Sequence, residues 1–200
     1  MLVLNLTDKN WAGFIQSGLT SHVTGEFYVP SASYVGTTVA KDAVGIWVGI
    51  GGVSVDPLWQ AGVAVNVSYN NIETVTPWYE AYPSNPVYSN SMHFNPGDLV
   101  QVWTNYSNGA STFEIKDYST GQSWGKSISF TRNTSTGEWV AESIGYTLPN
   151  FTDITWTSSS SNTGNLISSI QARAQAISGV TEMYCGFITE PTQFTVEHVG

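Results

Sequence analysis

Apolar and polar residues alternate over short runs along most of the chain. The alternation is clearest in Gly62-Val-Ala-Val-Asn-Val-Ser68 and in Glu138-Trp-Val-Ala-Glu142. A period of two places one kind of side chain on each face of a β-strand. Turn residues such as Asn95-Pro-Gly-Asp98 separate the runs. We therefore predict about ten strands: Val23–Val29, Ala43–Ile50, Ala61–Ser68, Leu99–Thr104, Ser111–Lys116, Ser127–Thr131, Glu138–Ser143, Asp153–Thr157, Met183–Thr189 and Gln193–His198.

Successive strands without helices between them indicate an all-β fold. We predict a concanavalin A-like β-sandwich, or jelly roll, built from two antiparallel sheets. Because 200 residues fit one domain and no boundary is evident, we assign 1–200 to a single domain. One short helix is predicted near 165–178, where apolar residues recur close to the helical period: Leu166, Ile167, Ile170, Ala174 and Ile177.

The charge of the chain excludes some classes of function. Fifteen acidic and six basic residues give a net charge of −9, and only 10% of residues are charged. Six scattered bases cannot form the basic face that nucleic acid requires. No apolar run reaches the length of about 18 residues that indicates a membrane span. With few bases, the chain has few carboxylate ion pairs to lose in acid, which is compatible with acid tolerance or with an ordinary acidic surface.

The sequence lacks the residues or motifs of several common catalytic sites. Cys185 is the single cysteine, which excludes an internal disulfide. The three histidines, His22, His93 and His198, are far apart in sequence and show no metal-ligand spacing, so we predict no metal site. No serine-nucleophile elbow or phosphate-binding loop occurs. Carboxylates, amides and aromatic side chains remain as candidates, and none of them requires a cofactor.

A pair of carboxylates would suit glycoside hydrolysis. Glu138 and Glu142 share one strand face, but four residues separate their backbones by roughly 13 Å. Glycosidase pairs need about 5 Å for retention or up to about 9.5 Å for inversion. A pair from different strands, such as Glu80 with Glu142, stays open.

One carboxylate and one neutral amide form a second possible site. The carboxylate would take a proton from water, and the amide would donate a hydrogen bond to the oxyanion that develops on a carbonyl. A glutamine donates at every pH and does not repel the carboxylate. Gln60, in Leu58-Trp-Gln-Ala-Gly-Val63, is such an amide, although a glutamine there can also simply cap a strand end.

Eight segments follow one another in an order and with a spacing typical of one enzyme family. They are Asn10–Gly13, Val23–Pro30, Trp47–Gly51, Gln60–Val63, Trp78–Pro83, Asn95–Asp98, Thr120–Ser123 and Glu138–Glu142. They resemble the glutamic peptidases, or eqolisins, which are acid endopeptidases best known from filamentous fungi. The resemblance covers about residues 10 to 157, with a weaker fit at the C-terminal strand.

The resemblance implies two seven-stranded sheets with the active site on a concave face. It gives Gln60 the role of oxyanion stabiliser, and it gives Glu142, the second glutamate of its motif, the acid/base role. Four further residues match positions that line the substrate cleft of the family: Trp11, Trp47, Tyr79 and Glu80. For the aromatic residues the structural alternative is core packing, and for Glu80 it is a solvated carboxylate.

These features predict an acid endopeptidase that acts on polypeptides with no metal or cofactor. An ordinary carboxyl pKa of about 4.3 implies a working pH of about 2 to 5. By the resemblance we expect a secreted monomer in an acidic environment, whose leader and propeptide are absent from this chain. Gly51 stands where the fungal enzymes carry an aspartate, and Asp56 could replace it. The rival hypotheses are a carbohydrate-binding jelly roll and a glycosidase.

Overall fold

Strands account for all of the regular secondary structure in the described part of the chain. The structure, a computed structural model, describes residues 5–8, 10–18, 20–37, 41–52, 57–130, 136–144, 147–162, 169–175, 181–186 and 192–199. None of these residues is helical, so no membrane-spanning helix is found among them.

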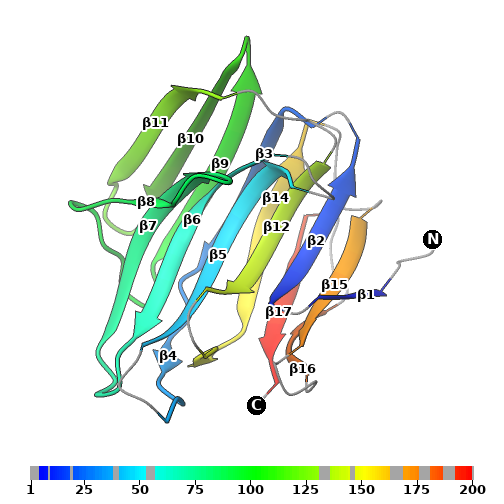
Figure 1. The fold of residues 1–200 in the computed structure, drawn as a ribbon. Helices are drawn as coiled ribbons and strands as arrows, with labels where there is room; N and C mark the ends of the chain where they lie inside the picture. The colour runs from blue at the N-terminus through cyan, green and yellow to red at the C-terminus, as the bar shows by residue number, and fades with distance from the viewer. Residues whose placement is uncertain are drawn as a thin grey trace.

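The strands form two layers that lie face to face (Figure 1). The first layer has the order β15 (Ser169–Gln175), β2 (Trp11–Ser17), β12 (Thr136–Ser143), β5 (Asp42–Gly51), β6 (Leu58–Val67), β7 (Glu73–Ala81) and β8 (Val87–Tyr88). The second has the order β11 (Ser123–Ser129), β10 (Ala110–Asp117), β9 (Leu99–Ser107), β3 (His22–Tyr28), β14 (Ile154–Ser161), β17 (Phe194–His198) and β16 (Thr181–Cys185). The predicted sandwich is confirmed.

The two layers are joined at one side. There β15 pairs with β16, so the hydrogen-bonded order continues from one layer into the other. The short β1 (Asn5–Asp8) pairs with β15 in parallel, and every other pairing among the described strands is antiparallel. The strands β4 (Ala32–Ser33) and β13 (Asn150–Phe151) form a separate two-stranded sheet. Each of the ten predicted strands overlaps a strand of the structure, although 131 and 187–189 lie outside the described residues.

The core lies between the two layers. On β6 the inward positions Trp59, Ala61 and Val63 alternate with the outer face and are fully buried. Tryptophan side chains also bridge the layers through hydrogen bonds. Trp59 Nε1 donates to the carbonyl of Thr112 on β10 at 3.1 Å, and Trp139 Nε1 donates to that of Thr24 on β3 at 2.8 Å. The layers are therefore held by polar contacts as well as by apolar burial.

The helix predicted near 165–178 is wrong over residues 169–175. These residues form β15, which pairs with β2 in a register that sets Ile170 opposite Ile15. The physical reason is visible in the sequence, because Ile170, Ala172 and Ala174 alternate with polar residues as well as following a helical spacing. Pairing with β2 and β16 satisfies the strand backbone on both sides and outweighs local helix propensity. The remainder of the predicted helix lies outside the described residues.

Candidate active site

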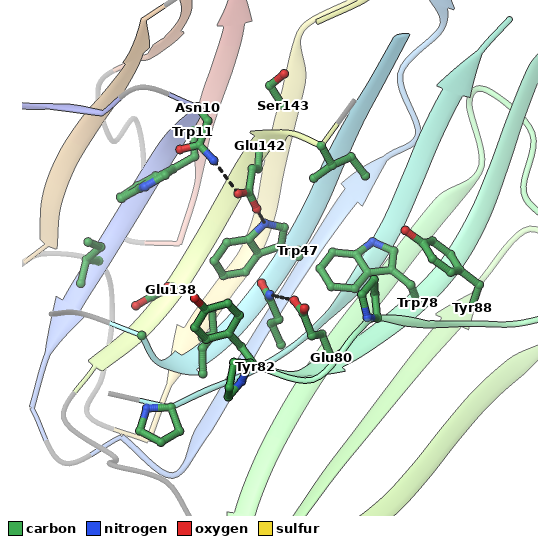
Figure 2. Close-up of a pocket in the computed structure, with 18 residues that line it drawn as sticks. Asn10, Trp11, Trp47, Trp78, Glu80, Tyr82, Tyr88, Glu138, Glu142 and Ser143 are labelled. Carbon is green, nitrogen blue, oxygen red and sulfur yellow. Dashed lines mark hydrogen bonds between the residues drawn. The ribbon is translucent and has the colours of Figure 1, made fainter. Parts of the chain in front are cut away.

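The outer face of the first layer carries a pocket of about 1170 Å³. Strands β2, β12, β5, β6 and β7 supply most of its wall, and β8 and residues flanking these strands supply the rest (Figure 2). Its polar and aromatic lining residues are Asn10, Trp11, Trp47, Gln60, Trp78, Glu80, Tyr82, Tyr88, Glu138, Glu142 and Ser143. Three glutamates and no basic side chain appear among the described lining residues, so the pocket favours groups that are neutral or positively charged.

Glu142 accepts a hydrogen bond on each carboxylate oxygen. Asn10 Nδ2 donates to Oε1 at 2.8 Å, and Trp47 Nε1 donates to Oε2 at 3.0 Å. Figure 2 shows both donors meeting the carboxylate, Asn10 from the residue before β2 and Trp47 from β5. Two N–H donors stabilise an ionised carboxylate and fix its orientation. Glu142 is therefore held as an oriented base at the edge of the pocket.

A glycine on the central strand sets the position of Trp47. A Cβ atom added to Gly49 would lie 2.9 Å from Cζ3 of Trp47 and 2.9 Å from Cδ1 of Leu58. The missing side chain thus lets the indole lie close against β5. Trp47 is only 4% exposed, and its Nε1 points to Glu142. The Trp-Val-Gly segment consequently orients the indole N–H that donates to Glu142.

Gln60 and Glu80 are paired across β6 and β7. The register sets them directly opposite each other, and Gln60 Nε2 donates to Glu80 Oε2 at 2.5 Å. Gln60 is 5% exposed, and its Oε1 atom is buried without a hydrogen-bond partner. Burial raises the pKa of Glu80, and the hydrogen bond from Gln60 opposes that rise. Burial therefore favours the neutral form of Glu80, whereas the hydrogen bond from Gln60 favours its ionised form.

Glu138 is a third carboxyl in the pocket wall, and it is almost completely buried. It is 6% exposed, and Thr136 Oγ1 lies 3.4 Å from its Oε1. Burial raises the pKa of Glu138 to about 8, the Thr136 hydroxyl opposes the rise, and the charge of Glu142 adds to it. Glu138 is therefore neutral in acid while Glu142, four residues away on the same strand, is held by two N–H donors.

The groups that contact the pocket carboxyls Glu142 and Glu80 are neutral hydrogen-bond donors. Among the described residues, no group of three or more histidine, cysteine, aspartate or glutamate side chains is close enough to hold a metal ion. The donors around Glu142 are neutral N–H groups, and the partner of Glu80 is an amide. The described side chains of the pocket can thus orient a carboxylate and offer an amide donor to a bound substrate.

A comparison with protein-family models decides the relationship of the chain. The model described as Peptidase A4 family matches residues 9–196.

The chain belongs to the Peptidase A4 family.

Solved structures agree with this membership at the level of the fold. A crystal structure of scytalido-glutamic peptidase with a transition state analog inhibitor matches with a TM-score of 0.78 and 22% identity, covering 96% of this chain and 99% of that one. SCP-B, a member of the eqolisin family in a complex with the tripeptide Ala-Ile-His, matches with a TM-score of 0.76 and 23% identity over the same shares. A search of curated proteins gave no match. The resemblance to the eqolisins is confirmed, and the chain is a peptidase.

Most of the site residues predicted for this A4 peptidase meet in one pocket. Trp11, Trp47, Gln60, Glu80 and Glu142 all line it. Their strands are far apart in sequence but neighbours in the order β2-β12-β5-β6-β7.

Tyr79 is the exception among the predicted site residues. It lies on the inner face of β7, is 6% exposed, and packs in the core against Trp59 and Phe113. The side chains of a strand alternate between its two faces, so Glu80 in the pocket places Tyr79 in the core. Tyr79 is therefore a core residue, the structural alternative given above, and it does not line the pocket.

Trp78 and Asn10 are among the pocket residues that were not predicted as site residues. Trp78 lines the pocket from β7, and its position two residues before Glu80 is the signal that could have identified it. Asn10 precedes β2 and reaches Glu142, which lies opposite Trp11 in the register. Only this long-range pairing reveals the role of Asn10, because nothing in its local sequence points to a carboxylate 132 positions away.

Gly51 stands at the position where the fungal members carry an aspartate, and it takes part through its backbone carbonyl. Gly51 has a φ of 87°, and its carbonyl accepts a hydrogen bond from Thr136 Oγ1 at 3.0 Å. Thr136 also contacts Glu138, so the buried carboxyl is linked to this end of β5. Asp56, the suggested replacement, lies outside the described residues.

The raised pKa of Glu138 predicts that this A4 peptidase loses stability as the pH rises. A glutamate with a pKa of 4.5 in the unfolded chain and about 8 in the folded state keeps its proton only in the folded state between these values. The free energy of unfolding therefore falls from about pH 4.5 to about pH 8, by up to about 5 kcal/mol at about 1.4 kcal/mol per pKa unit. Replacing Glu138 by Gln should flatten this decline.

Urea unfolding at pH 4, 6 and 8 measures the effect. The wild-type chain should lose stability across the series, and Glu138→Gln should lose clearly less. Stability curves that run parallel in the two proteins would show that Glu138 does not carry the pH dependence.

Proposed function

We propose that the pocket hydrolyses internal peptide bonds of polypeptides in acid, with Glu142 and Gln60 as the catalytic residues. The observation that carries the proposal is the carboxylate of Glu142, held by two N–H donors in the same pocket that contains a buried amide. A general base must be ionised and oriented toward its proton. An oxyanion stabiliser must donate a hydrogen bond without carrying a charge that repels the base.

In the proposed reaction, Glu142 takes a proton from a water molecule as the water oxygen attacks the scissile carbonyl carbon. The carbonyl oxygen becomes an oxyanion, which accepts a hydrogen bond from Nε2 of Gln60. Glu142 then gives the same proton to the amide nitrogen, and the carbon–nitrogen bond breaks. The products are a carboxylic acid and an amine, and Glu142 returns to its ionised form.

The strand order supports a polypeptide substrate that lies across the centre of the pocket. Gln60 on β6 and Glu142 on β12 flank β5, where they face Gly49 and Gly45. Trp47 lies between these two glycines on the same face and forms the floor between the catalytic residues. An extended chain can pass over an aromatic floor while its carbonyl groups reach both sides.

The same strand order weighs against a glycosidase. Glu80 on β7 and Glu142 on β12 are separated by β6 and β5 across the sheet and by four residues along it, which puts their backbones roughly 19 Å apart. Their side chains are engaged elsewhere, Glu80 with Gln60 and Glu142 with Asn10 and Trp47. A glycosidase pair needs its carboxyls within about 9.5 Å.

The test is digestion of a denatured protein, with the products identified by mass spectrometry. We expect peptides cut at internal bonds below about pH 5, which would also suit secretion into an acidic environment. Chelators and reagents for serine or cysteine nucleophiles should leave the rate unchanged. Removal of single terminal residues only, or inhibition by a chelator, would contradict the proposal.

A further inference from the structure

The pairing of Gln60 with Glu80 raises a problem for catalysis. The donor atom that would stabilise the oxyanion, Nε2, is engaged by the carboxyl of Glu80, and the other amide atom, Oε1, is a buried acceptor without a partner. If Glu80 is ionised, it also places a negative charge beside the developing oxyanion. Like charges at such short range oppose each other strongly in a buried site. In this state Gln60 is poorly suited to its proposed role.

The distance between the two groups fits a different proton arrangement. N–H···O bonds are usually about 2.7–3.2 Å long, whereas O–H···O bonds extend down to about 2.5 Å. The pair is separated by 2.5 Å. An amide exchanges the places of its oxygen and nitrogen by a half-turn about its terminal bond. A neutral Glu80 could then donate its O–H to the amide oxygen, which otherwise has no partner.

We propose that protonation of Glu80 turns the Gln60 amide, so that Oε1 accepts the Glu80 proton and Nε2 no longer donates to the carboxyl. This inference rests on the proposed function, because it requires Gln60 to be the oxyanion stabiliser. Glu80 is then a positioning residue that makes the amide competent in acid and blocks it when ionised. It makes no covalent contribution to the reaction.

The surroundings of Glu80 favour the neutral form. Burial raises the pKa of Glu80, against the hydrogen bond from Gln60. The other titratable groups that line the pocket are Tyr82, Tyr88, Glu138 and Glu142, and no described lining residue is basic. The pKa of Tyr88 is raised by burial and by the charge of Glu80, so these two groups lie close enough to oppose each other's ionisation.

The two carboxyls therefore have opposite requirements. Glu142 must be ionised to act as a base, so activity rises as the pH passes its pKa from below. Glu80 must be protonated to free the amide, so activity falls as the pH passes its pKa from below. The pair predicts a bell-shaped pH profile in which the descending limb belongs to Glu80.

The experiment compares pH profiles of kcat and KM from pH 2 to 8 on a peptide substrate. In Glu80→Gln the new amide is neutral at every pH and can still donate to Oε1, so the descending limb should move up by about one pH unit or more. The change should appear in kcat with little change in KM. Glu26→Gln is the matched control, because Glu26 accepts from Gln101 Nε2 at 2.9 Å on the other layer, and its profile should coincide with that of the wild type.

The outcomes separate this inference from the function on which it rests. A descending limb that stays in place or moves down in Glu80→Gln, or a folded Glu80→Gln protein with no activity at any pH, overturns the role of Glu80. Activity retained in Glu142→Gln or Gln60→Ala, assayed beside it, overturns the catalytic pair instead.

If Glu80→Gln does not fold, the wild-type protein still gives an answer. The side-chain amide protons of Gln60, followed by NMR, should shift with a midpoint at the descending limb. Resonances that do not move through that limb contradict the inference.

Discussion

Replacing Glu142 by Gln is expected to lower kcat by about 10²–10⁴-fold or more, the range for loss of a general acid–base group. The variant keeps the size of the side chain and an oxygen that can accept from Asn10 or Trp47. It cannot take a proton from water or return one to the leaving nitrogen. KM should change little, because the wall and floor of the pocket stay in place. The measurement is kcat and KM on a peptide substrate near pH 4.

Glu73→Gln is the control for this variant. Glu73 begins β7 outside the pocket, where burial raises its pKa, and its carboxylate accepts a hydrogen bond from the backbone N–H of Ala32. The same chemical change there should leave kcat near the wild-type value. Substantial turnover by Glu142→Gln, after wild-type contamination has been excluded, would contradict the catalytic role of Glu142.

Replacing Gln60 by Ala is expected to lower kcat by about 10²–10³-fold, the cost of removing one oxyanion donor. Gln60→Met should do the same, because methionine fills a similar volume but has no N–H to donate. Agreement between the two variants separates the loss of the hydrogen bond from the loss of packing at a side chain that is 5% exposed. Steady-state kinetics near pH 4 gives the values.

Gln101→Ala provides the comparison for Gln60. Gln101 donates to Glu26 in the other layer, so its loss removes a glutamine–glutamate pair far from the pocket. This variant should keep its turnover. A Gln60→Met protein that works as fast as the wild type would show that the amide does not stabilise the transition state.

The strands were largely readable from the sequence because their signal is local. Alternation along β6 and β12 placed both strands. The segment at 169–175 failed because its apolar residues satisfy two periods at once, and only pairing with β2 decides between them. The order of the strands depends on contacts between distant segments, which no local pattern encodes.

The site was predictable in part, and the limits have a physical origin. The family resemblance indicated Gln60 and Glu142. Alternation within Trp78-Tyr-Glu80 implies that Trp78, on the same face as Glu80, lines the pocket and that Tyr79 does not. The two donors to Glu142 come from segments 132 and 95 positions away. The pairing of Gln60 with Glu80 likewise depends on the β6–β7 register. Electrostatic roles of this kind appear only when the strands are assembled.

The central claim is that Glu142 drives peptide hydrolysis in acid. The most direct measurement is digestion of a denatured protein from pH 2 to 8 by the wild-type chain and by Glu142→Gln in parallel, with circular dichroism confirming that both are folded. We predict cleavage that peaks below about pH 5 and disappears in the variant. Equal cleavage by the two proteins, or no cleavage at any pH by a folded wild-type chain, would contradict the claim.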